Sequence, residues 1–185
     1  SRTVASIDDA EIGRFAFLLR SGRAVLLPSY QGTYERRRTI PQGSSSERDL
    51  IVQQSKDFQR SLDYLETRAD IARGRLGFFG ISGGSQAGLI VLAEESRIRA
   101  AVLAEEGLPA MRRPPETDVI NFAPHVRIPV LRLNGRYDFV FLASFHCFVF
   151  WKLRKRTSTS YCSTPDMRGR HGSTSKKASI GSTAI

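Results

Sequence analysis

The sequence predicts an α/β fold with three layers, in which helices cover both faces of a mostly parallel sheet. Short apolar runs that suit buried strands alternate along the chain with longer stretches that suit helices. In addition, glycines surround a serine at residues 80–84, where one predicted strand should turn into a helix. Because the carboxyl ends of parallel strands share one edge of a sheet, we expect any active residues to gather at that edge.

Before the glycine-rich turn, the sequence predicts a helix, a strand and a second helix. The first helix covers residues 8–20, whose apolar side chains form one broad face. Residues 24–27, with the sequence AVLL, have the composition of a buried strand. Residues 47–66 carry apolar side chains at helical spacing, which predicts the second helix.

The remaining predicted elements continue the alternation. Residues 76–79 form a short apolar run suited to a buried strand that leads into the turn. The apolar run at residues 87–93 predicts the helix that follows the turn. Residues 100–103 and 128–133 predict two further strands of the same sheet.

The segment Gly80-Ile81-Ser82-Gly83-Gly84 fits the pattern G-x-S-x-G. In this pattern the glycines permit a strained turn that lifts the serine hydroxyl over the end of a sheet, where it acts as a nucleophile. Ser82 is therefore the candidate nucleophile. One alternative is that the serine only caps the next helix. The other is a dinucleotide-binding turn, which is disfavoured because the spacing G-x-G-x-x-G is absent.

Asp138 is the candidate acid of a catalytic triad. It follows the last predicted strand, in the polar turn at residues 134–138. In one triad arrangement the acid comes after the nucleophile in chain order, and it orients the imidazole and stabilises its charged form. The alternative is that Asp138 only closes a turn. Glu105 and Glu106, which follow the preceding strand, are the fallback acids.

Three long segments carry a family resemblance that covers the chain up to Phe141: SGRAVLLPSYQGTYERR, DYLETRADIARGRLGFFGISGG and INFAPHVRIPVLRLNGRYDFVF. They resemble the dienelactone hydrolase or prolyl-oligopeptidase-like branch of the α/β-hydrolases. More narrowly, they resemble a domain fused to bacterial serine/threonine protein kinases. The resemblance implies that Ser82 is the nucleophile, that Gly83 is an oxyanion donor through its backbone N–H, and that Asp138 is the acid. It also implies a small ester or peptide substrate and a covalently fused kinase domain.

The histidine of the triad is where the sequence departs from the family pattern. His125 precedes Asp138, so it is out of chain order. His146 follows Asp138 too closely for the helix and strand that normally intervene. His171 has a tolerable spacing, but the stretch before it contains no predicted strand. No histidine is therefore assigned to the site.

The composition changes abruptly near residue 142. Residues 1–141 hold 20 Lys and Arg against 17 Asp and Glu, a net charge of +3, whereas residues 142–185 hold 8 basic residues and one acid, a net charge of +7. We interpret residues 1–141 as a partial hydrolase domain and residues 142–185 as a basic, Ser/Thr-rich tail that is disordered or read in a shifted frame. The shift would fall just after Phe141, because shifted codons of the tail can encode residues that resemble the family's closing segments.

The amino end also lacks an expected part. In the hydrolase fold a second oxyanion N–H comes from a loop after a strand that precedes the first helix, and the sequence shows no such strand. The fold is therefore expected to be truncated at its N-terminus and disrupted at its C-terminus. Gly32 offers a substitute donor, although a simple turn is the competing interpretation. Without the histidine and this loop, we expect weak or no hydrolase activity.

Length and charge bound the other function classes. A chain of 185 residues forms one domain, and its net charge of +10 lies mostly in the tail, so we expect no specific nucleic-acid partner. No run has the length of a membrane helix, and no metal-ligand spacing or cofactor motif is present. Two cysteines make no disulfide framework, which favours the cytoplasm. The alternative function is a non-catalytic ligand-sensing domain associated with a serine/threonine kinase.

Overall fold

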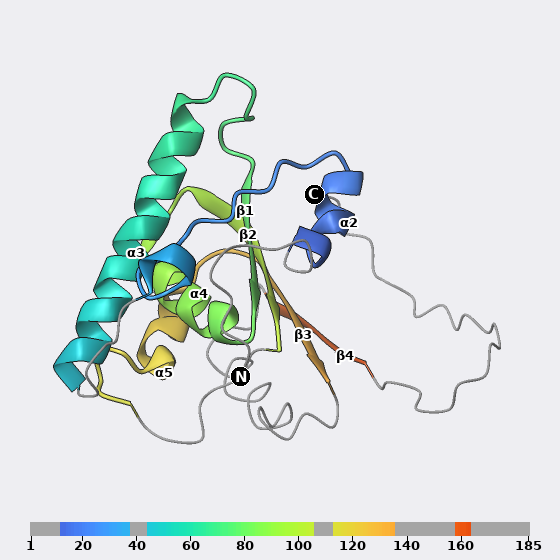
Figure 1. The fold of residues 1–185 in the computed structure, drawn as a ribbon. Helices are drawn as coiled ribbons and strands as arrows, with labels where there is room; N and C mark the ends of the chain where they lie inside the picture. Colours follow the sequence, from blue (N-terminus) through green and yellow to red (C-terminus); the bar gives the residue numbers. More distant parts are fainter. Residues whose placement is uncertain (1–11, 38–43, 106–112, 136–157, 164–185) are drawn as a thin grey trace.

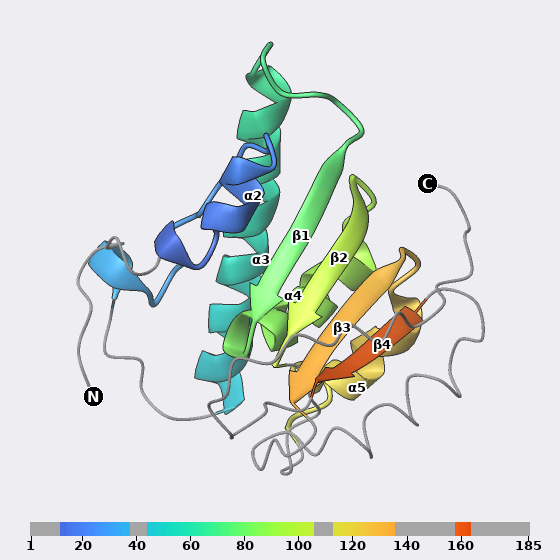
Figure 2. The same cartoon turned by 90° about the vertical axis from the view of Figure 1, so that its right-hand side faces the viewer.

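The computed structural model describes residues 12–37, 44–105, 113–135 and 158–163. Its centre is a four-stranded sheet in the order β1-β2-β3-β4, and every neighbouring pair is parallel. The strands are β1 (Leu76–Ile81), β2 (Ile98–Ala104), β3 (Val130–Gly135) and β4 (Ser158–Ser163). Figures 1 and 2 show the sheet edge-on and from one face. The predicted parallel α/β sheet is therefore confirmed.

Helices lie on both faces of this sheet. The longest is α3 (Ser44–Thr67), followed by α4 (Gly83–Glu94), α5 (Val119–Phe122) and the short 3₁₀ helix η2 (Ala123–His125). Figure 1 shows α3, α4 and α5 on one side of the sheet and α2 (Ala16–Arg20) on the other. A further 3₁₀ turn, η1 (Tyr34–Arg36), leads from α2 toward α3.

The hydrophobic core lies between the sheet and the helices α3, α4 and α5. Leu89 of α4, Ile98 and Leu103 of β2, and Val119 of α5 are at most 1% exposed. The predicted helix at residues 87–93 is buried on most sides, which suits a helix held between a sheet and a second helix. Around these four side chains the core also contains Phe58, Leu62, Ile90, Leu92, Ala101, Val126 and Val130.

The register brings the carboxyl ends of the strands to one edge. Ile81 of β1 lies opposite Ala104 of β2, and Ala104 lies opposite Leu133 of β3. Helix α4 begins directly after β1, at residue 83 rather than near the predicted residue 87. Strand β3 extends through Gly135, so residues 134 and 135 finish the strand instead of forming a turn. The turn at Ser82 consequently stands at the edge where active residues were expected.

Two predictions for the amino-terminal part are wrong. Residues 24–27 form no strand, and Leu26 is 38% exposed, because within the described ranges this segment pairs with no strand. The helix predicted over residues 8–20 is interrupted, since residues 14 and 15 form a turn before α2 begins. Gly13 precedes this break, and glycine is a poor helix former.

A further correction concerns the tail. The expectation that no strand precedes His171 is wrong, because β4 lies at Ser158–Ser163 and pairs along its whole length with β3. Backbone hydrogen bonds between strands need no particular side chain, so a Ser/Thr-rich segment can complete a ladder. The proposed frame shift stays a prediction.

Candidate active site

Ser82 occupies the junction between β1 and α4. Its backbone angles are φ 52° and ψ −117°, a left-handed conformation that is strained for a residue with a side chain. Its half-buried side chain makes no capping hydrogen bond to α4. The capping interpretation is therefore disfavoured. A strained turn that spares its hydroxyl from local hydrogen bonding is the geometry that the G-x-S-x-G pattern predicts.

Close approach of the backbone explains two of the surrounding glycines. A Cβ atom on Gly80 would lie 2.8 Å from the carbonyl oxygen of Gly84, inside the first turn of α4. A Cβ on Gly88 would lie 2.5 Å from the Phe78 ring. Both glycines thus allow α4 to cross close over β1. Gly84 differs, because nothing lies within 4 Å of a Cβ added there.

The carbonyl of Ala104, the last residue of β2, holds the turn from the other side. It accepts one hydrogen bond from the Ser82 backbone N–H at 2.9 Å and another from the Ser85 hydroxyl at 2.8 Å. Ser85 is fully buried. Sequence reasoning missed this positioning residue, and its only signal was a third polar position after the nucleophile within an otherwise apolar helix.

Gly83 begins α4 and places a backbone N–H beside Ser82. The first N–H groups of an α-helix have no intrahelical acceptor, and the helix dipole makes this end favourable for negative charge. Gly83 is exposed, and a Cβ added to it would meet nothing within 4 Å. This N–H is therefore open to solvent next to the Ser82 hydroxyl, in the position suited to an oxyanion donor.

The loop at residues 30–32 supplies no second donor. The N–H of Gly32, whose φ is 88°, donates to the carbonyl of Arg36 at 3.1 Å. The N–H of Gln31 donates to Asp57 Oδ2 at 2.7 Å. Both N–H groups are thus engaged inside the molecule, which supports the competing interpretation that Gly32 forms a turn.

Asp57 of α3 anchors this same loop. Its carboxylate also pairs with Arg36 at 2.7 Å, and Gln54, one turn earlier on α3, donates to the carbonyl of Gln31. Burial, together with the negative charge of Asp57, raises the pKa of Tyr30 to about 12. Tyr30 is consequently a neutral phenol at physiological pH, and the loop is fixed to the helix rather than free to move over Ser82.

The candidate acids stand at the correct edge to different extents. Glu105 directly follows β2, with φ 50°, and its N–H donates to the carbonyl of Leu133 at 2.8 Å. Asp138 and Glu106 lie outside the described residues. Strand β3, which leads toward Asp138, is two strand spacings from β1, roughly 10 Å. A gap of that size between nucleophile and acid leaves space for an imidazole.

Only one of the three histidines is described. His125 ends η2 and precedes the amino end of β3, so it lies at the opposite edge of the parallel sheet from Ser82. It therefore cannot serve as the base, in agreement with its chain order. His146 and His171 lie outside the described residues.

A basic side chain stands near the nucleophile turn. Gln86, one turn along α4, donates its backbone N–H to the carbonyl of Ser82 and accepts a hydrogen bond from Arg113 at 3.3 Å. Sequence reasoning did not single out either residue. Among the described residues, no group of His, Cys, Asp and Glu is arranged to hold a metal ion. None of the helices in the described ranges has the length and hydropathy needed to cross a membrane.

No protein-family model and no curated protein matches the sequence. Among solved structures, an acylaminoacyl peptidase in complex with Z-Gly-Gly-Phe-chloromethyl ketone aligns over 76% of this chain with a TM-score of 0.57 and 12% identity. The AtxE2 isopeptidase aligns over 64% with a TM-score of 0.51 and 16% identity. The Pyrococcus horikoshii acylaminoacyl peptidase aligns over 60% with a TM-score of 0.50 and 12% identity.

These structures are much longer than the matched region. The alignment spans 28% of the first peptidase and 22% of each of the other two. At such identities the likeness concerns the fold alone. Together with the parallel sheet and the junction at Ser82, it shows that the described part of this chain has the α/β-hydrolase fold.

Proposed function

We propose that the chain derives from a serine hydrolase that cleaves small ester or peptide substrates through an acyl-enzyme. The observation that carries this proposal is the left-handed backbone of Ser82 at the β1–α4 junction, with a side chain that makes no capping bond. Strain at a residue other than glycine persists where the surrounding structure imposes it, and such residues cluster at active sites. The peptidase names of the structural neighbours support the same reaction class.

In this reaction the Ser82 hydroxyl attacks the carbonyl carbon of the substrate while a base takes the hydroxyl proton. The carbonyl oxygen becomes an oxyanion, and the Gly83 N–H at the start of α4 stabilises it. Collapse of the tetrahedral intermediate expels the alcohol or amine, which receives the proton. Water then attacks the acylated serine by the reverse route and restores the hydroxyl. Asp138 is the proposed partner that orients the base.

The proposed activity is weak. The N–H groups of Gln31 and Gly32 are occupied, so the described residues offer one oxyanion donor beside Ser82 instead of two. Loss of one such donor costs about 10²–10³ in rate. No described histidine stands at the carboxyl edge of the sheet, and the base therefore remains unassigned.

Fluorophosphonate labelling tests the proposal. We expect slow, stoichiometric labelling at Ser82, together with slow hydrolysis of p-nitrophenyl acetate, and both should disappear in Ser82→Ala. The matched control is Ser96→Ala, because Ser96 is an exposed serine beyond the end of α4. Labelling that is unchanged in Ser82→Ala would overturn the hydrolase assignment. Rapid, Ser82-dependent labelling would support the assignment and contradict the weak activity.

The kinase connection and the cytoplasmic location remain proposals that rest on the family resemblance. A kinase reading frame continuous with this chain would support them. The ligand-sensing alternative predicts binding of a small molecule with no labelling at Ser82, so the same fluorophosphonate experiment distinguishes it from a hydrolase.

A further inference from the structure

Strand β1 has one open edge. It is the first strand of the sheet, and within the described ranges it pairs only with β2. The N–H of Ser82 points to β2, since it donates to the carbonyl of Ala104. Backbone groups alternate in direction along a strand, so those of Phe78 and Gly80 also face β2. The N–H and C=O groups of Gly77, Phe79 and Ile81 therefore face the open edge.

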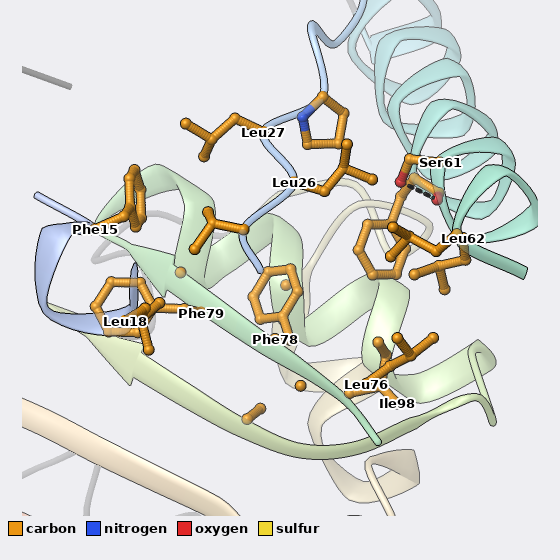
Figure 3. Close-up of a pocket in the computed structure, with 18 of the residues that line it drawn as sticks. Phe15, Leu18, Leu26, Leu27, Ser61, Leu62, Leu76, Phe78, Phe79 and Ile98 are labelled. Atoms are coloured by element: carbon orange, nitrogen blue, oxygen red, sulfur yellow. Dashed lines mark hydrogen bonds between the residues drawn. The ribbon is translucent and has the colours of Figure 1, made fainter. Parts of the chain in front are cut away.

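This open edge forms the floor of a deep groove. On one side of the sheet, Phe15 and Phe17 from the region of α2 pack edge-on against Phe79, with ring centroids 5.7 and 5.5 Å apart. On the other side, Phe58 of α3 packs edge-on against Phe78 at 5.7 Å. Opposite the edge runs the segment at residues 24–28. Figure 3 shows Leu26 and Leu27 of this segment across the groove from Phe78 and Phe79.

The size and lining of the groove indicate what it holds. Its volume is about 1830 Å³, whereas pockets for small ligands measure about 300–1,000 Å³. Aliphatic and aromatic side chains from α2, α3, β1 and residues 24–28 dominate the lining. Unpaired backbone groups along an apolar floor match an extended peptide, because a peptide satisfies those groups while burying alternate apolar side chains.

Charge distinguishes the two ends of the groove. The charged residues that line it are five arginines and one aspartate, Asp70. Asp70 is already paired with Arg68 at 2.6 Å. Arg75, directly before β1, and Arg99, near the start of β2, are exposed and make no ion pair with a described residue. The end of the groove beside the amino ends of the strands is therefore basic.

We propose that this groove binds an extended segment of a partner polypeptide, which adds to β1 as a further strand. The segment is apolar at alternate residues and carries acidic residues at the end that lies beside Arg75 and Arg99. Because every pair in the sheet is parallel, the acidic end is the amino end of the bound segment.

Hydrogen exchange measured by NMR on the full chain tests this proposal, with the peptide Asp-Glu-Val-Thr-Val-Ile-Val-Thr as the probe. We expect the amides of Gly77, Phe79 and Ile81 to become protected when the peptide is added. Those of Phe78 and Gly80, which face β2, should change little. The control peptide has the same sequence with N-methyl groups on every second residue, in both possible phases, and neither version should protect the edge.

Arginine variants test the orientation. Arg75→Gln and Arg99→Gln should each weaken peptide binding by about two- to fivefold, the range for an exposed ion pair of about 0.5–1 kcal/mol. Arg73→Gln, an exposed arginine in the same loop that is absent from the groove lining, should not change it. A peptide with its acidic residues moved to the carboxyl end should bind more weakly.

Two results would overturn the proposal. One is unchanged exchange at Gly77, Phe79 and Ile81 at millimolar peptide. The other is protection of these amides in the free protein together with a dimer in sedimentation, which would assign the groove to a second copy of the chain. The experiment is performed on Ser82→Ala as well, so that its outcome does not depend on the proposed hydrolase activity.

Discussion

At the scale of single residues, glycines 80 and 84 of one pentapeptide play opposite parts. Gly80 is required by packing, because any side chain there would run into the backbone of Gly84. Backbone atoms cannot rotate away as the end of a side chain can. Gly84 is free of such contacts and lies inside the first turn of α4. The two positions therefore separate steric need from helix preference.

We expect Gly80→Ala to lower the free energy of unfolding by about 1–3 kcal/mol, the usual cost of forcing atoms into a packed site. Gly84→Ala should instead raise it by about 0.5–1 kcal/mol, because alanine favours the helix. Urea denaturation of both variants measures the difference. If the two variants were equally stable, the close approach of α4 to β1 would not be what requires Gly80.

The conformation of Ser82 was predictable from sequence, and the role of Ser85 was not. The G-x-S-x-G pattern names a particular turn, so the pattern alone predicts the backbone at Ser82. Ser85 is functionally placed because the carbonyl of Ala104 happens to lie opposite it. That contact depends on the register of β2 against β1, which no local pattern specifies.

At the scale of elements, an ion-pair cluster joins α3 to the end of α4. Arg97 contacts Glu95 at 2.8 Å and reaches Asp63 and Glu66 of α3 at 2.8 and 3.5 Å. Glu95 is only 7% exposed. Hydrogen bonds from Arg97 hold the pKa of the Glu95 carboxyl below its usual value, despite the opposing effect of burial. The cluster therefore contributes stability that depends on pH.

A lowered pKa in the folded state means that the stabilisation is present above the unfolded pKa of Glu, near 4.5, and is lost as pH falls through the folded value. We expect Glu95→Gln to lower the free energy of unfolding by on the order of 1–3 kcal/mol at pH 7. The difference from the parent chain should shrink below pH 4. Thermal denaturation across pH 3–7 measures it.

The matched control for this prediction is Glu94→Gln. Glu94 is the exposed neighbour of Glu95 at the end of α4. Its replacement should change stability little at any pH. A Glu95→Gln effect that is the same at pH 3 and pH 7 would mean that the charge of Glu95 does not act through Arg97.

Element prediction succeeded where burial imposes a pattern and failed where pairing depends on distant chain. Residues 76–79, 100–103 and 128–133 were expected as strands and lie within or overlap β1, β2 and β3. Residues 24–27 have a strand's composition, yet composition does not say whether a partner is available. Strand β4 is the converse case, because its partner β3 provides the ladder while its Ser/Thr-rich sequence gives no apolar signal.

At the scale of the whole molecule, the chain divides by composition near residue 142, although β4 beyond that point joins the sheet. We predict a shifted reading frame just after Phe141, because the basic, Ser/Thr-rich composition begins there and no triad histidine is found. Independent sequencing of the gene across the Phe141 codon measures it. We expect an inserted or deleted base at that point. An intact frame in independent reads, with no family-like product one base away, would remove the idea.

The double hydrogen bond at the Ala104 carbonyl has a thermal consequence. It joins the nucleophile turn to the middle of the sheet through β2, and Ser85, which makes the second bond, is shielded from water. A turn fixed in this way does not loosen ahead of the strands that hold it. Heat inactivation of the serine should thus coincide with melting of the sheet, rather than precede it as in enzymes whose reactive loops fray first.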